Sequence, residues 1–154
     1  MVIFVRLLIF LFVSVSIYPN LITGKVVRVL DGDSIHVKIN DDQFVMIRLF
    51  GIDAPELDQR FGRQSKKYLS TLILNQQIQL QFLELDNYGR RLAIIFNDKG
   101  RNINLDLIES GHAWVYQNYY SDPKWLSLQH QAKEERKGLW HKTSPIPPWL
   151  FRRK

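Results

Sequence analysis

Apolar residues recur at two different periods along the chain, and the change of period predicts where strands give way to helices. Ile35, Val37 and Ile39 alternate with polar residues, which is typical of a half-buried strand. A β-branched run at 26–30 precedes them across the turn Asp-Gly-Asp, and "FVMIRLF" at 44–50 follows a second turn. The pattern predicts three consecutive strands joined by short links.

Helical spacing replaces this alternation at 60–74, in "RFGRQSKKYLSTLIL", where we expect a first helix. Two more alternating runs, at 78–85 and 91–96, predict a fourth and a fifth strand on either side of the turn "DNYGR". This order fits an α+β, mainly β fold, a five-stranded OB-fold Greek-key barrel with about three helices. Other small α+β arrangements would give a similar order of elements.

The C-terminal third predicts two helices and a tail. A short helix at 103–108 is expected to end at Gly111. Asp122 and the proline after it predict the start of a last helix, which we expect to run to Lys137. The Pro-rich basic tail at 142–154 is expected to be non-helical, because proline disrupts helix interiors.

The first 20 residues differ from the rest in hydropathy. Arg6 is their only charge, and residues 7–15 are almost continuous hydrocarbon. An apolar stretch of about 11 residues after a short positive start is typical of a secretory signal peptide, and is short for a membrane span. We expect a secreted or periplasmic protein whose globular domain spans 21–141. A membrane anchor and a buried first strand are the alternatives. As a signal peptide or as an anchor, residues 1–20 are expected to make at least transient contact with a membrane.

Composition narrows the list of partners. The 154 residues suit one globular domain, and nothing in them demands an obligate protein partner or more than a monomer. With 21 Lys and Arg against 15 Asp and Glu, the net charge of +6 favours polyanions such as nucleic acid or acidic lipid. The absence of cysteine excludes disulfides, thiolate metal sites and cysteine nucleophiles.

Charged residues gather where the third predicted strand ends, in "RLFGIDAPE" at 48–56. Asp53 there and Asp33 in the first turn are oxygen ligands of the kind that Ca²⁺ prefers. Arg48 and Arg90 have the forked geometry that binds phosphate oxygens. Glu56 would accept a proton from an attacking water, which completes the needs of a phosphodiester hydrolase. Taken singly, each of these pieces also fits a structural turn.

The combined set "DGDS…RLFGIDAPE…DNYGRRLA…GHAWVY" resembles the thermonuclease family, the staphylococcal-nuclease-like domain, over roughly residues 22–141. The resemblance implies an OB-fold barrel with three helices that binds Ca²⁺ and hydrolyses DNA and RNA. It also implies little sequence specificity, a preference for single strands and products with 3′-phosphate ends.

The same resemblance assigns roles to individual residues. Asp33 and Asp53 match the carboxylates that bind the metal, and Ala54 matches the residue whose backbone carbonyl binds it. Glu56 matches the catalytic glutamate, which acts as general base or positions the water. In the staphylococcal protein a threonine stands at the position of Ala54, and a carbonyl ligand does not depend on that difference.

Two arginines and a group of tyrosines complete the match. Arg48 matches the arginine that clamps the phosphate, and Arg90 the one at the leaving 5′-oxygen. Tyr88 matches a tyrosine that contacts the substrate, and Tyr116 and Tyr119 fall near a further pair in an ambiguous register. Asn87 replaces a lysine of the staphylococcal protein, which predicts weaker substrate binding.

Two other functions compete with the nuclease interpretation. One is a non-catalytic OB-fold module that binds single-stranded nucleic acid through a basic groove and aromatic stacking. The other is a membrane-tethered interaction domain that keeps its N-terminal segment. The complete set of Asp33, Asp53 and Glu56 favours the enzyme.

Overall fold

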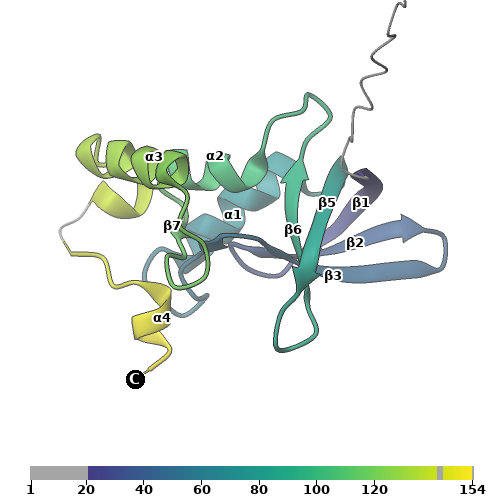
Figure 1. The fold of residues 1–154 in the computed structure, drawn as a ribbon, viewed down its shortest axis with the longest axis horizontal. Coiled ribbons are helices and arrows are strands. Elements are labelled where there is room, and N and C mark those ends of the chain that lie inside the picture. Colours follow the sequence, from purple (N-terminus) through teal and green to yellow (C-terminus); the bar gives the residue numbers. More distant parts are fainter. Residues whose placement is uncertain (1–20, 142–143, 154) are drawn as a thin grey trace, which may run out of the picture.

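The computed structural model describes residues 21–141 and 144–153, and five of its strands close into a barrel. These are β1 (Leu21–Val29), β2 (Ser34–Asn40), β3 (Gln43–Leu49), β5 (Gln77–Leu85) and β6 (Arg91–Phe96). Around the barrel they follow the order β1-β2-β3-β6-β5, with β3 and β6 parallel and the other pairs antiparallel (Figure 1). This topology confirms the predicted five-stranded OB-fold barrel.

The barrel interior is filled by branched aliphatic side chains. In β2 the alternation predicted from the sequence holds from Ile35 to Lys38, since Ile35 and Val37 are fully buried whereas His36 and Lys38 are half-buried. Every strand of the barrel contributes to this core, whose most buried members are Val26, Ile35, Val37, Ile47, Leu49, Ile78, Leu80 and Ile95. The chain contains no cysteine, so this packing is what holds the barrel.

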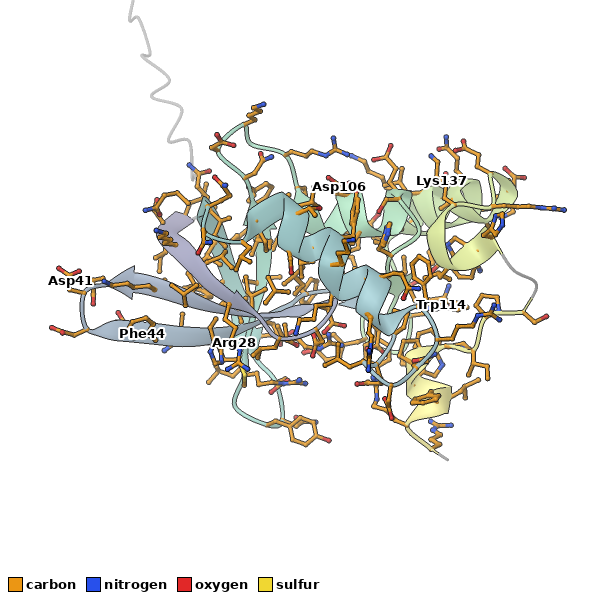
Figure 2. The ribbon with its side chains drawn as sticks, turned by 180° about the vertical axis from the view of Figure 1, so that it is seen from behind. Arg28, Asp41, Phe44, Asp106, Trp114 and Lys137 are labelled. Carbon is orange, nitrogen blue, oxygen red and sulfur yellow. The ribbon has the colours of Figure 1, made fainter. Side chains whose placement is uncertain are left out.

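Helices α1 (Gly62–Ile73) and α2 (Ile103–Glu109) pack against strands β1 and β6 of the barrel, respectively, and α3 (Pro123–Glu134) packs against α2 and the short strand β7 (Trp114–Val115) (Figure 1 and, from behind, Figure 2). Asp122 caps α3 as predicted, its Oδ1 accepting a hydrogen bond from the Lys124 N–H at 2.7 Å. The predicted end at Lys137 is wrong, because the helix ends at Glu134. Arg136 adopts a left-handed conformation, and the Lys137 N–H returns to the Ala132 carbonyl, which stops the helix three residues earlier than predicted.

A second sheet has only two short strands, β4 (Ile52–Asp53) and β7 (Trp114–Val115). In this antiparallel pair Ile52 lies opposite Val115, and Asp53 lies opposite Trp114. Two residues are too few to show a period, so the sequence pattern did not predict these strands. They hold the segment that follows β3 against the helical side of the molecule.

The C-terminal segment is not wholly irregular. A 3₁₀ turn, η1 (Gly138–His141), follows α3, and a four-residue helix, α4 (Pro148–Phe151), lies near the end of the chain. The prediction of a non-helical tail is therefore wrong. Pro148 occupies the first helical position, where its missing N–H would have no helical partner in any case.

Within residues 21–141 and 144–153, no helix is long and apolar enough to cross a membrane. Residues 1–20, interpreted from the sequence as a signal peptide or an anchor, lie outside the described part of the chain.

Candidate active site

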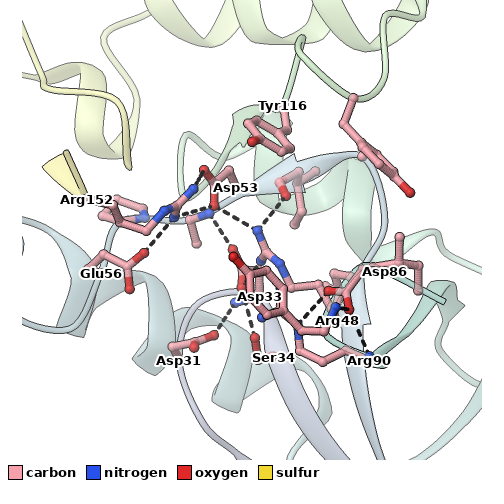
Figure 3. A pocket seen from close by; sticks show the side chains of 18 of the residues that line it. Asp31, Asp33, Ser34, Arg48, Asp53, Glu56, Asp86, Arg90, Tyr116 and Arg152 are labelled. Atoms are coloured by element: carbon pink, nitrogen blue, oxygen red, sulfur yellow. Dashed lines mark hydrogen bonds and ion pairs between the residues drawn. The ribbon is translucent and has the colours of Figure 1, made fainter. Parts of the chain in front are cut away.

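One cavity of about 600 Å³ brings together every residue that the sequence analysis selected for chemistry (Figure 3). Its walls come from the β1–β2 turn, the end of β3, the segment from β4 to Glu56, the β5–β6 turn and the segment after β7. The predicted residues in its lining are Asp33, Arg48, Asp53, Ala54, Glu56, Tyr88, Arg90, Tyr116 and Tyr119. Residues far apart in the sequence therefore share one site.

Asp33 is held in the β1–β2 turn by hydrogen bonds from its surroundings. The Asp33 backbone N–H donates to Asp31 Oδ1 at 3.0 Å, and Ser34 Oγ donates to Asp33 Oδ1 at 3.1 Å. The Ala54 N–H donates to Asp33 Oδ2 at 2.6 Å, although the two residues are 21 positions apart. Asp33, the predicted carboxylate ligand, is therefore in direct contact with Ala54, the residue of the predicted carbonyl ligand.

Arg48 joins the two predicted metal carboxylates. Its Nη1 pairs with Asp33 Oδ1, and its Nη2 lies 2.8 Å from Asp53 Oδ1. The register of β2 and β3 sets Ser34 opposite Arg48, which brings the first turn to the end of β3. Because only 11% of the Arg48 side chain is exposed, these ion pairs lie largely out of water.

Gly51 makes the bend that carries the chain from β3 into β4. It has φ 74°, and a Cβ atom there would lie 2.7 Å from the ring of Trp125. A side chain at this position would therefore be strained and would collide with the ring. After the bend, Asp53 is 1% exposed and points into the cavity (Figure 3).

Glu56 follows in a turn whose backbone is pinned. Its N–H donates to Gln59 Oε1 at 3.1 Å, and its carbonyl accepts from the Gln59 N–H at 2.9 Å. Gly62, the first residue of α1, lies so close that a Cβ atom would come within 1.7 Å of the Glu56 carbonyl oxygen. The start of α1 thus fixes the backbone that carries the Glu56 carboxylate.

Asp86 orients Arg90, and the sequence analysis missed it. Its Oδ1 accepts from the N–H groups of Tyr88 and Arg90, both at 2.9 Å, and its Oδ2 accepts from Arg90 Nε at 2.7 Å. An aspartate that opens a glycine-containing turn four residues before the arginine was the available signal. The Arg90 guanidinium also lies 5.4 Å from the centre of the Tyr88 ring.

Tyrosine rings stand around the mouth of the cavity. Tyr88 is 85% exposed, so most of its ring is open to solvent and can stack on a base. Tyr116 and Tyr119 are roughly parallel, with ring centres 6.4 Å apart, and the Tyr119 hydroxyl donates to Glu84 Oε1 at 2.6 Å. Exposed aromatic faces beside arginines suit the bases and phosphates of a single strand.

Arg152, from the end of α4, is the second residue that the sequence analysis missed. Its guanidinium lies 2.8 Å from Asp53 Oδ2 and 2.7 Å from Glu56 Oε1 (Figure 3). Nothing in a short basic C-terminus indicates that one of its arginines reaches carboxylates almost 100 positions earlier. The contact depends on how the tail folds back.

The carboxylates of the site differ in how readily they ionise. Burial opposes ionisation of Asp33, but the adjacent Arg48 outweighs it and lowers the pKa of that carboxyl. Burial raises the pKa of Asp53, against the opposing contacts with Arg152 and Arg48. Burial, together with the charge of Asp33, raises the pKa of Asp31 to about 6. Arg48 thus holds Asp33 in the charged form that a metal ligand needs.

The donor atoms of the site fit a hard divalent cation. In the described residues, no group of three or more His, Cys, Asp or Glu side chains is arranged to hold a metal. The site expected from the sequence does not need three such side chains, because it has two carboxylates, Asp33 and Asp53, and its third oxygen is the Ala54 backbone carbonyl. Arg48 contacts both carboxylates, and Arg152 contacts Asp53 and Glu56, so positive charge is already stabilised at this place.

Comparisons with known proteins agree with this geometry. Residues 46–142 match the model of the family described as staphylococcal nuclease homologue. An uncharacterized endonuclease of Escherichia coli O157:H7 is 40% identical over 131 residues, which cover 85% of each chain. A micrococcal nuclease of Shigella flexneri is 35% identical over 153 residues, covering 93% of this chain and 87% of the relative. A probable staphylococcal-like nuclease of Oryza sativa subsp. japonica is 32% identical over 76% of this chain and 32% of its own length.

Proposed function

The chain belongs to the staphylococcal nuclease homologue family, and we propose that it is a Ca²⁺-dependent nuclease that hydrolyses DNA and RNA to products with 3′-phosphate ends. The observation that carries the proposal is the convergence of Asp33, Arg48, Asp53 and Glu56 in one cavity, with Arg90 also in its wall. This set combines oxygen ligands, forked cations and a proton acceptor, which are the groups that phosphodiester hydrolysis requires.

Asp33, Asp53 and the Ala54 carbonyl would hold the cation, which when bound supplies Lewis-acid polarisation of a phosphoryl oxygen. Glu56 orients a water for attack on phosphorus and accepts its proton. Because Arg48 is already fixed by two ion pairs, its guanidinium meets the phosphate with little loss of side-chain freedom.

Arg90 completes the reaction on the leaving side. As the bond from phosphorus to the 5′-oxygen breaks, negative charge grows on that oxygen, and the Arg90 guanidinium stabilises it. The 5′-oxygen takes a proton from solvent water and departs as a hydroxyl, so the phosphate stays on the 3′ side. Asp86 keeps Arg90 oriented for this role through its 2.7 Å contact with Nε.

The substrate is a polynucleotide with little sequence preference, and single strands are favoured. Arginines bind phosphates, which are the same for every sequence, and exposed tyrosines stack on any base. The signal-like residues 1–20 would direct the enzyme out of the cytoplasm, either released or held at the membrane. We propose that it acts as a monomer.

The test is a digestion assay with purified protein on single-stranded DNA, duplex DNA and RNA. Each substrate is incubated with Ca²⁺, with Mg²⁺ or with chelator, and the 3′ ends of the fragments are analysed for phosphate. The proposal predicts Ca²⁺-dependent cleavage, fastest on single strands, to 3′-phosphate ends. Binding without cleavage under every condition would contradict it and support the non-catalytic OB-fold module.

A further inference from the structure

The C-terminal segment folds back over the site and is anchored there. The Gln59 side chain donates to the Ile146 carbonyl at 2.6 Å, which ties the segment to the turn after Glu56. The Trp149 ring in α4 lies 5.7 Å from the ring of Trp114 in β7 and 5.7 Å from that of Tyr116. These contacts set the end of α4 beside the cavity, with Arg152 as the next residue.

The Arg152 guanidinium takes up carboxylate oxygens of the site. It spans both oxygens of Asp53, with Nη1 3.1 Å from Oδ1 and Nη2 2.8 Å from Oδ2. Its Nη1 also donates to Glu56 Oε1 at 2.7 Å. Arg48 binds the same Asp53 Oδ1 from another side, so both oxygens of this carboxylate already have cationic partners (Figure 3).

We propose that Arg152 is a built-in competitor of the divalent cation, so that docked Arg152 and bound metal exclude one another. A cation bound through Asp53 needs an oxygen atom that Arg152 occupies, and two positive groups at one carboxylate repel each other. The inference rests on the proposed function, since it takes Asp53 as a metal ligand. By linkage, the metal releases Arg152 to the same extent that Arg152 weakens metal binding.

Of the two arginines that bind Asp53, Arg152 is the one suited to leave. Its side chain is 42% exposed, whereas that of Arg48 is 11% exposed. Water screens the pairs of an exposed arginine, so they are weak and exchange at low cost. Removing Arg48 would instead leave buried carboxylates unpaired. When Arg152 leaves Asp53, it also leaves the Glu56 carboxylate. Metal binding and exposure of the catalytic base therefore occur together.

The experiment is a calorimetric titration of Ca²⁺ into the full chain and into Arg152→Met, with Arg153→Met as the matched control. Arg153 is the exposed neighbour, so its replacement removes the same charge from the same tail. We expect Arg152→Met to bind Ca²⁺ about threefold to tenfold more tightly than the wild type, and Arg153→Met to change little. Arg152→Lys, which keeps the charge without the fork, should lie between the wild type and Arg152→Met.

Several results would overturn the inference. Equal Ca²⁺ affinity in the wild type and Arg152→Met would mean that the guanidinium does not compete. Weaker binding by Arg152→Met would mean that Arg152 supports the metal site. Equal tightening by both methionine variants would assign the effect to the overall charge of the tail. Failure of the proposed function gives a different result. In that case neither the wild type nor any variant binds Ca²⁺, and Asp53→Asn, which removes the proposed metal ligand, does not differ from the wild type.

Discussion

At the scale of single residues, Arg48 and Arg90 line the same cavity but have different surroundings. Arg48 is buried between Asp33 and Asp53, whereas Arg90 pairs with Asp86 at a partly exposed turn. Both should be needed for catalysis, yet only Arg48 should matter for stability, because only its loss leaves buried carboxylates poorly paired.

Paired lysine substitutions test this difference. We expect Arg48→Lys to lower kcat/KM by about 10²–10³-fold and to lower the free energy of unfolding by about 1–3 kcal/mol, since lysine cannot bridge both carboxylates. Arg90→Lys should lower kcat/KM as well, but should leave the free energy of unfolding within about 0.5 kcal/mol of the wild type. Steady-state kinetics and urea unfolding measure both quantities. Equal stability losses in the two variants would contradict the account.

A second residue-scale prediction concerns His112, away from the cavity. Burial lowers its pKa to about 4, and its ring is stacked on that of Tyr68 with centres 3.9 Å apart. Between its ordinary pKa of 6.5 and this value, the unfolded chain binds a proton that the folded protein does not. Stability should therefore fall as the pH is lowered through this window.

Urea unfolding at about pH 7 and about pH 5 measures the effect. His112→Gln should reduce the loss of stability between the two pH values, whatever it does to stability at the higher one. The control is His130→Gln, which removes an exposed histidine of α3 and should change the free energy of unfolding by less than about 0.5 kcal/mol at either pH. An unchanged pH dependence in His112→Gln would show that another group is responsible.

At the scale of elements, the start of α1 is built against the turn that carries Glu56. A Cβ atom at Gly62 would overlap the Glu56 carbonyl oxygen, so any side chain there must displace the turn or the helix. We expect Gly62→Ala to lower the free energy of unfolding by about 1–3 kcal/mol and to lower kcat. Gln64→Ala, at an exposed position of the same helix, should stay within about 0.5 kcal/mol of the wild type. Chemical denaturation and steady-state kinetics measure both effects. A Gly62→Ala variant that is as stable and as active as Gln64→Ala would contradict the prediction.

Elements with a long enough period were predictable from the sequence, and short ones were not. The strands around Ile35 and Val37 alternate over several residues, and α1 repeats over 12. The two-residue strands β4 and β7 exist because they pair with each other, which no local pattern shows. In the tail, the prolines predict a segment without helix, whereas Pro148 occupies the first position of a short one.

The candidate site was predictable to the extent that its residues lie at element junctions. Asp33, Asp53 and Glu56 follow turns and strand ends, so a barrel brings them together once the strands pair. Asp86 was overlooked because its role lies in local hydrogen bonds to the turn. Arg152 was not predictable, because its place depends on tertiary packing of Trp149 against Trp114 and Tyr116.

At the scale of the whole molecule, a single cavity is built from four separate segments, at 31–34, 48–56, 86–92 and 116–119, and the C-terminal segment adds Arg152 to its lining. The barrel supplies the carboxylates and arginines at fixed positions, while the C-terminal segment adds a removable cation. The positive net charge of +6 attracts polynucleotides to the molecule as a whole. The removal of the proton from the attacking water is then assigned to one residue in the cavity, Glu56.

The most direct test of this central claim is single-turnover cleavage of single-stranded DNA in Ca²⁺ by Glu56→Gln. The matched control is Glu109→Gln, at an exposed position at the end of α2. We predict that Glu56→Gln folds and binds DNA as the wild type does but cleaves it about 10²–10⁴-fold more slowly, because the amide cannot accept the proton of the attacking water. The control should cleave at the wild-type rate. Cleavage by Glu56→Gln at the rate of the control would contradict the assignment of Glu56 as the base and, with it, this account of the site.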